Sequence, residues 1–186
     1  MDKKIELSQE QIEEIVDSSN MNLSEKQRNE MIANLKNGKK SPNTLILQGD
    51  IESLQDWIDD GLDVNETNFS DTPLLALAII YSDIDIVKLL IENGANVNIV
   101  VEDKPLLAFT LMSDIEIIKL LIENGADVNV LDNNKPLVLQ ALMFGNNEFV
   151  KLLIENGANI EFQNNSSLLE QALLFSNTEI VELCIG

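Results

Sequence analysis

The amino-acid sequence predicts an all-α fold, in which short helix–turn–helix repeats stack into a solenoid behind an N-terminal helical cap. A first observation is that residues 86–98 return almost unchanged at residues 117–129 and, more loosely, at residues 149–161. A second is that a proline-containing turn stands ahead of each copy, at residues 72–75, 104–107 and 135–138. Self-similarity at a fixed period is the signature of a repeat architecture, in which each unit buries its apolar surface against its neighbours.

The period of the repeat is set by four glycines, which are Gly61, Gly94, Gly125 and Gly157. Their intervals are 33, 31 and 32 residues, and the first of them closes a degenerate copy over residues 54–65. Glycine fits the left-handed position that ends a helix, so each of these residues predicts the end of a second helix.

The residues between these markers predict two helices in each repeat. A proline is tolerated at the start of a helix, where its missing N–H costs nothing, so Pro73, Pro105 and Pro136 each indicate the beginning of a first helix. In the second helices the pattern Ile-Val-Lys-Leu-Leu-Ile-Glu leaves only Lys88 and Glu92 polar in residues 86–92. Such a narrow polar stripe indicates a helix packed between neighbours.

These residues resemble the ankyrin repeat, whose pattern is a Thr-Pro-Leu-His turn, a second helix of the Ile-Val-Lys-Leu-Leu-Leu type and Gly-Ala-Asp-Val-Asn. The resemblance runs from about Pro42 to the C-terminus and covers four to five repeats. The family's histidine is replaced by Leu75, Leu107 and Val138, so the hydrogen bond it makes across the turn is expected to be absent. The resemblance implies a non-catalytic module for protein–protein interaction.

The two ends of the chain depart from the repeat, and we divide it into residues 1–40 and an ankyrin repeat domain over residues 41–186. Short amphipathic helices are expected near residues 8–16 and 24–35; they form either a cap over the first repeat or a partner-binding arm. The last repeat ends apolar, although terminal repeats normally carry a polar outer face. It therefore packs loosely, meets another chain or a second copy, or is shortened.

Composition excludes several classes of function. The chain has 32 acidic and 12 basic residues, no histidine and a single cysteine, so an internal disulfide, a Cys/His zinc site and a histidine-based triad are excluded. No phosphate-binding loop or calcium loop is present, and we expect no catalytic residue, cofactor or metal. With neither a signal peptide nor a membrane-spanning segment, the expected location is cytoplasmic. A formal charge of −20 disfavours direct binding to nucleic acid.

The candidate partner-binding residues follow from the resemblance, because partners of such arrays contact the turn tips and the exposed side of the first helices. Each first helix should present an outward pair, and all of these residues are apolar: Ile80, Tyr81, Leu111, Met112, Met143, Phe144, Leu174 and Phe175. Two turn tips, Phe69 and Phe162, add further apolar surface. Either this column binds a partner, or curvature and an N-terminal arm cover part of it.

Acidic residues belong to the repeats, which hold 24 acids and five bases from residue 41 onward, a net charge of −19. Carboxylates that follow the first helices, including Asp83 and Asp114, should form a rim beside the apolar column. Such a rim either steers a basic partner or only maintains solubility. We therefore expect an intracellular inhibitor, antitoxin or immunity-type protein that masks a basic protein. The alternative is an acidic mimic of nucleic acid that occupies a DNA- or RNA-binding protein.

Overall fold

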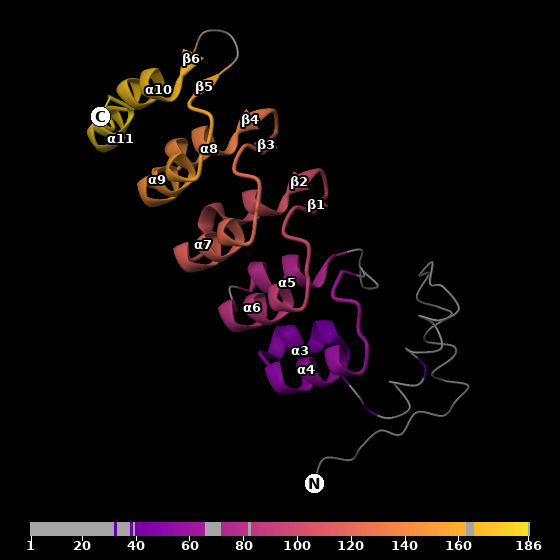
Figure 1. Ribbon diagram of the computed structural model, residues 1–186. Helices are drawn as coiled ribbons and strands as arrows, with labels where there is room; N and C mark the ends of the chain where they lie inside the picture. The colour runs from indigo at the N-terminus through magenta and orange to yellow at the C-terminus, as the bar shows by residue number, and fades with distance from the viewer. Residues whose placement is uncertain are drawn as a thin grey trace.

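The computed structural model describes residues 32, 38, 40–65, 72–81, 83–162 and 166–185. Within them, five helix pairs stack in sequence order and form a solenoid, and three short β-hairpins project from one side of the stack (Figure 1). The all-α solenoid predicted from the sequence is thus confirmed, and the strands of its three hairpins are two residues long.

Each repeat consists of a first helix and an antiparallel second helix. The first helices are α3 (Pro42–Gln48), α5 (Leu74–Ile80), the 3-10 helix η1 (Leu106–Met112), α8 (Leu137–Met143) and α10 (Leu168–Leu174). The second helices are α4 (Ile51–Asp59), α6 (Ile84–Glu92), α7 (Ile115–Glu123), α9 (Asn147–Glu155) and α11 (Thr178–Ile185). The hairpins pair β1 (Val100–Val101) with β2 (Lys104–Pro105), β3 (Leu131–Asp132) with β4 (Lys135–Pro136), and β5 (Glu161–Phe162) with β6 (Ser166–Ser167).

Asp or Asn residues precede the second helices of the first four repeats, and prolines precede three of the first helices. Asp50, Asp83, Asp114 and Asn146 cap the second helices, each accepting a hydrogen bond from a backbone N–H of the first turn. Pro73, Pro105 and Pro136 have extended backbone and stand immediately before their helices, one position earlier than predicted.

The core is a continuous layer of aliphatic side chains between successive helix pairs. In α6 the side chains of Ile86, Val87 and Leu90 are fully buried, while Leu89 and Ile91 are half-buried. The same positions are buried in α7 and α9, where Phe149 replaces isoleucine. Because these residues of each repeat pack against the next, the repeats stabilise one another.

A ladder of asparagines, at Asn65, Asn98 and Asn129, joins consecutive repeats on their exposed side. The Nδ2 of Asn98 donates to the carbonyl oxygen of Gly125 at 2.8 Å, and its Oδ1 accepts the N–H of Asp127 at 2.8 Å. Asn65 and Asn129 make the equivalent pairs of hydrogen bonds. Each side chain therefore links one repeat to the loop of the next through two contacts.

The first two hairpins turn through residues with positive φ. Glu102 and Asp103 have φ of 50° and 61°, and Asn133 and Asn134 have φ of 51° and 60°. Two successive left-handed residues suit a tight hairpin, but glutamate adopts this conformation less readily than asparagine or glycine. The first hairpin turn is therefore the more strained of the two.

The N-terminal prediction falls almost wholly outside the described residues. Of the helices expected near residues 8–16 and 24–35, only Ile32 is described, and it is buried. At the start of the repeats, the indole N–H of Trp57 donates to the backbone oxygen of Lys40 at 3.1 Å. This bond ties the chain ahead of α3 to the second helix of the first repeat.

Candidate protein-binding surface

Exposed apolar side chains gather where the first helices end. We call this surface the first-helix face, and its residues are Leu47, Ile80, Tyr81, Met143, Phe144, Leu174 and Phe175. Their exposed fractions lie between 50 and 74%. They belong to repeats 1, 2, 4 and 5, so the face extends along the stack.

Local structure explains why these side chains point outward. Tyr81, Phe144 and Phe175 are the C-cap residues of their helices, and each cap N–H is bonded to a carbonyl of the last turn. The chain reverses direction at this point to enter the second helix, and Gly145 and Ser176, the next residues in repeats 4 and 5, take positive φ. A side chain at such a reversal lies beyond the core.

The summed area of the first-helix face reaches the range in which apolar surface is often functional. An aromatic side chain offers about 150–250 Å² to burial, so three half-exposed rings present roughly 300 Å² together. The four aliphatic residues add to this area. Contiguous apolar patches of about 300–600 Å² are often functional.

One predicted member of this surface is wrong. Leu111 is only 7% exposed and belongs to the core. The interval from Pro105 to the capping residue Asp114 is one residue shorter than the interval from Pro73 to Asp83. The 3-10 helix η1 has seven residues, as α5 and α8 have, so the segment that is one residue shorter is the connection to the second helix. Leu111 is the sixth residue of its helix, as Ile79 and Leu142 are of theirs, and all three side chains are buried.

The remaining predicted apolar residues of the surface differ in exposure or lie outside the described residues. Phe162 is half-buried and packs against the core, so it is less open than a free turn tip. The side chain of Met112 and the whole of Phe69 lie outside the described part of the structure. The hairpin residues Val100 and Leu131, by contrast, are exposed by 62 and 53%.

The two carboxylates predicted in the acidic rim serve their own helices. Asp83 accepts the N–H of Ile86 at 3.1 Å, and Asp114 accepts the N–H of Glu116 at 3.0 Å. Asp83 is half-buried and Asp114 is exposed. Both are therefore helix caps first, placed beside the first-helix face by the short connection between helices.

Other acids near the starts of the second helices are paired with lysines. Asp85 lies 4.0 Å from Lys88 and Glu116 lies 2.8 Å from Lys119 within a helix, whereas Glu179 pairs with Lys151 across repeats. The hydrogen bond from Lys151, with a second from Asn147, lowers the pKa of Glu179.

The pKa values of two of these lysine partners are shifted upward. The hydrogen bond to Glu116 raises the pKa of Lys119, and that to Glu179 raises the pKa of Lys151. These contacts offset part of the negative charge at the beginnings of the second helices. Exposed acids at the opposite ends, such as Glu92, Glu123 and Glu155, have no basic residue in the same helical turn.

An ion pair between a buried carboxylate and a partly exposed lysine, which the sequence pattern did not reveal, joins two neighbouring hairpins. Asp132 is 5% exposed, and its Oδ2 lies 3.9 Å from the Nζ of Lys104. That Nζ also lies 5.0 Å from the ring centroid of Phe109. Buried Gln140 donates to the backbone oxygen of Asp132 at 2.7 Å. The cluster fixes the second hairpin against the third repeat and its own helix α8.

The described residues contain no group of three or more His, Cys, Asp or Glu placed to hold a metal ion. In the same part of the chain, no helix combines the length and apolar character needed to span a membrane. The site is thus a surface of exposed side chains.

Stacked helix pairs with projecting hairpins define a class of protein, the helical repeat scaffold, whose exposed side chains bind other proteins. A family model described as ankyrin repeats, in three copies, matches residues 44–132 and 106–185. The chain therefore belongs to the ankyrin repeat family, whose members are protein–protein interaction modules and typically non-catalytic. A comparison with curated proteins gave no match.

Proposed function

We propose that this ankyrin repeat protein is an intracellular inhibitor, of the antitoxin or immunity type, that masks the working surface of a basic protein. The observation that carries the proposal is the first-helix face, with seven apolar side chains each at least half exposed. Aromatic and methionine side chains are the residues that most often anchor a protein interface. Masking needs only such a surface and no chemistry.

Charge supports a basic partner. Four of the five lysines beyond residue 41, namely Lys88, Lys104, Lys119 and Lys151, are paired with acids of the array. The remaining carboxylates keep the array at a net charge of −19. A field of this sign speeds association with a positively charged protein, most strongly at low ionic strength.

The proposal is tested by capturing partners from a lysate of the source cell with wild type, Phe144→Asp and Leu131→Asp. Leu131 is the matched control, because it is exposed to a similar degree but lies on a hairpin. A basic protein held by wild type and Leu131→Asp, and lost by Phe144→Asp, would support a partner site on the first-helix face. If Phe144→Asp retains the same protein, the face does not bind it.

The captured protein then distinguishes inhibition from other outcomes. Its activity should fall when the array is added at stoichiometric amounts, and Phe144→Asp should leave that activity unchanged. Undiminished activity in the complex would contradict the inhibitor role and leave a scaffold. Displacement of the array by DNA or RNA, with a steep dependence on salt, would instead indicate a nucleic-acid mimic.

A further inference from the structure

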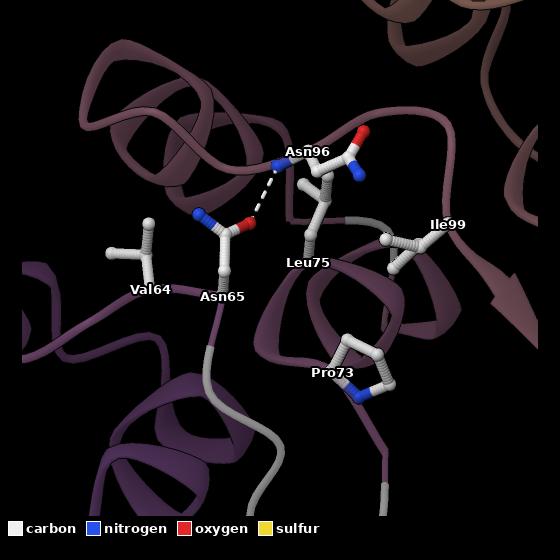
Figure 2. Close-up of a pocket in the computed structure, with 6 residues that line it drawn as sticks. All are labelled: Val64, Asn65, Pro73, Leu75, Asn96 and Ile99. Atoms are coloured by element: carbon white, nitrogen blue, oxygen red, sulfur yellow. Dashed lines mark hydrogen bonds between the residues drawn. The ribbon is translucent and has the colours of Figure 1, made fainter.

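Two pockets of equivalent construction lie at successive junctions between repeats. The first has a volume of about 330 Å³, and Figure 2 shows that three segments line it: the chain after α4, the start of α5 and the chain after α6. Its residues are Val64, Asn65, Pro73, Leu75, Asn96 and Ile99. The second, of about 350 Å³, is lined by Val97, Asn98, Ile99, Val100, Pro105, Leu106, Leu107, Asp127 and Val130.

The two pockets correspond position by position along the repeat. Val64 and Asn65 of the first are matched by Val97 and Asn98 of the second, and Pro73 is matched by Pro105. Ile99 lines both pockets, because it lies between one junction and the next. The site is therefore a repeated one, and a ligand that fits one pocket can extend into the other.

The floors of the pockets are apolar because of the residue that ends the proline turn. Leu75 and Leu107 line the pockets at the position where the family pattern has histidine. A leucine offers no hydrogen bond, so each pocket favours an aliphatic side chain over a polar one. The replacement of the family's histidine by leucine therefore makes the pockets at both junctions more apolar.

The polar edges of the two pockets differ in charge. At the first, the N–H of Asn96 donates to Asn65 Oδ1 at 2.7 Å (Figure 2), and at the second Asp127 makes the same contact with Asn98 at 2.8 Å. Replacing an amide by a carboxylate adds a negative charge at the second pocket only. The equivalence of the backbone contacts shows that either residue fits this position.

The spacing of the pockets defines the shape of the ligand. Packed helices lie about 8–10 Å apart, so the pockets are separated by about that distance, one repeat along the stack. A peptide in the polyproline II conformation advances about 3.1 Å per residue with three residues per turn, so its side chains i and i+3 lie on the same side, about 9 Å apart. An extended peptide in this conformation can therefore place side chains i and i+3 into the two pockets.

We propose that the junction pockets bind an extended basic peptide segment of a partner protein, with aliphatic side chains at positions i and i+3. A lysine or arginine beside the second aliphatic residue would face Asp127. The net charge of −19 on the array also favours a positively charged ligand. This surface is formed by loops and helix starts, and it is separate from the residues of the first-helix face.

Two labelled synthetic peptides of lysine, glycine and leucine test the proposal by fluorescence anisotropy against the full chain. One carries leucines at i and i+3, and the other has the same composition with adjacent leucines. We expect the spaced peptide to bind about tenfold more tightly, since only it can bury both leucines. Equal affinities would overturn the proposal, because they would show that charge alone holds the peptide.

Three variants locate the binding. Ile99→Ser should weaken the spaced peptide about tenfold, because it removes a wall of both pockets. Asp127→Asn should weaken it about two- to fivefold, as expected for an exposed charge pair. Phe144→Ser should leave its affinity unchanged. Unchanged binding by Ile99→Ser, or loss by Phe144→Ser, would contradict the assignment.

The controls keep the result independent of folding and of the inhibitor proposal. Asp127→Asn retains the fold because asparagine occupies the equivalent positions 96 and 159, where its Oδ1 accepts the same kind of N–H. If Ile99→Ser does not fold, NMR contacts between the leucine methyls of the peptide and Ile99 of wild type decide, and their absence refutes the site. Failure of partner capture by the first-helix face would not alter these measurements.

Discussion

The asparagine ladder makes a measurable prediction about how the repeats are held together. In the variant Asn98→Ala, the two hydrogen bonds to the loop of the next repeat are lost, to Gly125 and from Asp127, both 2.8 Å long. A hydrogen bond between neutral groups contributes about 0.5–1.5 kcal/mol net, so two give about 1–3 kcal/mol. Because Asn98 is exposed and water can replace its partners, we expect a loss of about 1–2 kcal/mol in the free energy of unfolding.

The assay is urea unfolding followed by circular dichroism, with Asn124→Ala as the matched control. Asn124 is also exposed, but its Nδ2 donates to Leu120 at 2.8 Å within a single repeat. Removing this bond should cost about 0.5 kcal/mol, the lower end of the range. The contrast between the variants isolates the contribution of the link between repeats.

A further signature separates coupling from general destabilisation. Stability of a repeat protein combines the stability of each unit with the interface between neighbours. Weakening the interface at Asn98 should therefore broaden the transition and lower its dependence on urea, while Asn124→Ala shifts the midpoint only. If Asn98→Ala costs no more than Asn124→Ala and leaves the slope unchanged, the ladder does not couple the repeats.

Three further predictions concern strain and charge. Replacing Glu102 and Asp103 by Asn and Gly should stabilise the chain by about 1 kcal/mol in urea unfolding, since these residues suit positive φ; equal or lower stability would show that the turn is not strained. Glu123→Lys should add about 0.3–1 kcal/mol by placing a cation at the end of α7, and thermal unfolding checks its sign. The pKa of Glu179 is lowered by its hydrogen bond from Lys151, and then by one from Asn147, so its contribution is present above the unfolded pKa near 4.5 and lost as the pH falls through the folded pKa. Wild type should therefore exceed Glu179→Gln in stability at neutral pH, and urea titrations at decreasing pH should show this difference shrinking below about 4.5; a constant difference would contradict the ion pair's role.

The outward pairs show how far a repeat pattern carries a prediction. In the family pattern two small residues of the first helix face inward and the next two face outward, which placed Ile80, Tyr81, Met143, Phe144, Leu174 and Phe175 on the surface, and all six are exposed. The same pattern placed Leu111 there, and it is buried. In this repeat the predicted pair falls one helix position early, because the connection to the second helix is one residue shorter, and Leu111 takes the buried position of Ile79.

The acidic rim shows a second limit of prediction from the sequence, which is the pairing of charges between repeats. The sequence predicted carboxylates beside the first-helix face, and Asp83 and Asp114 stand there as helix caps. The lysine partners of Asp85 and Glu116 lie three residues along the same helix and could be anticipated. The pairing of Lys151 with Glu179 joins two repeats and depends on how those repeats stack.

The sequence by itself determined the architecture, because the period of its prolines, glycines and apolar residues decides which positions must be buried between neighbours. It also determined the sign of the charge and the apolar character of the helix ends. Only the tertiary structure decided the burial of Asp132 beside Lys104 and the pockets at the junctions. Each of these depends on contacts between segments distant in the chain, where the stacking of one repeat on the next, rather than local pattern, decides which side chains meet.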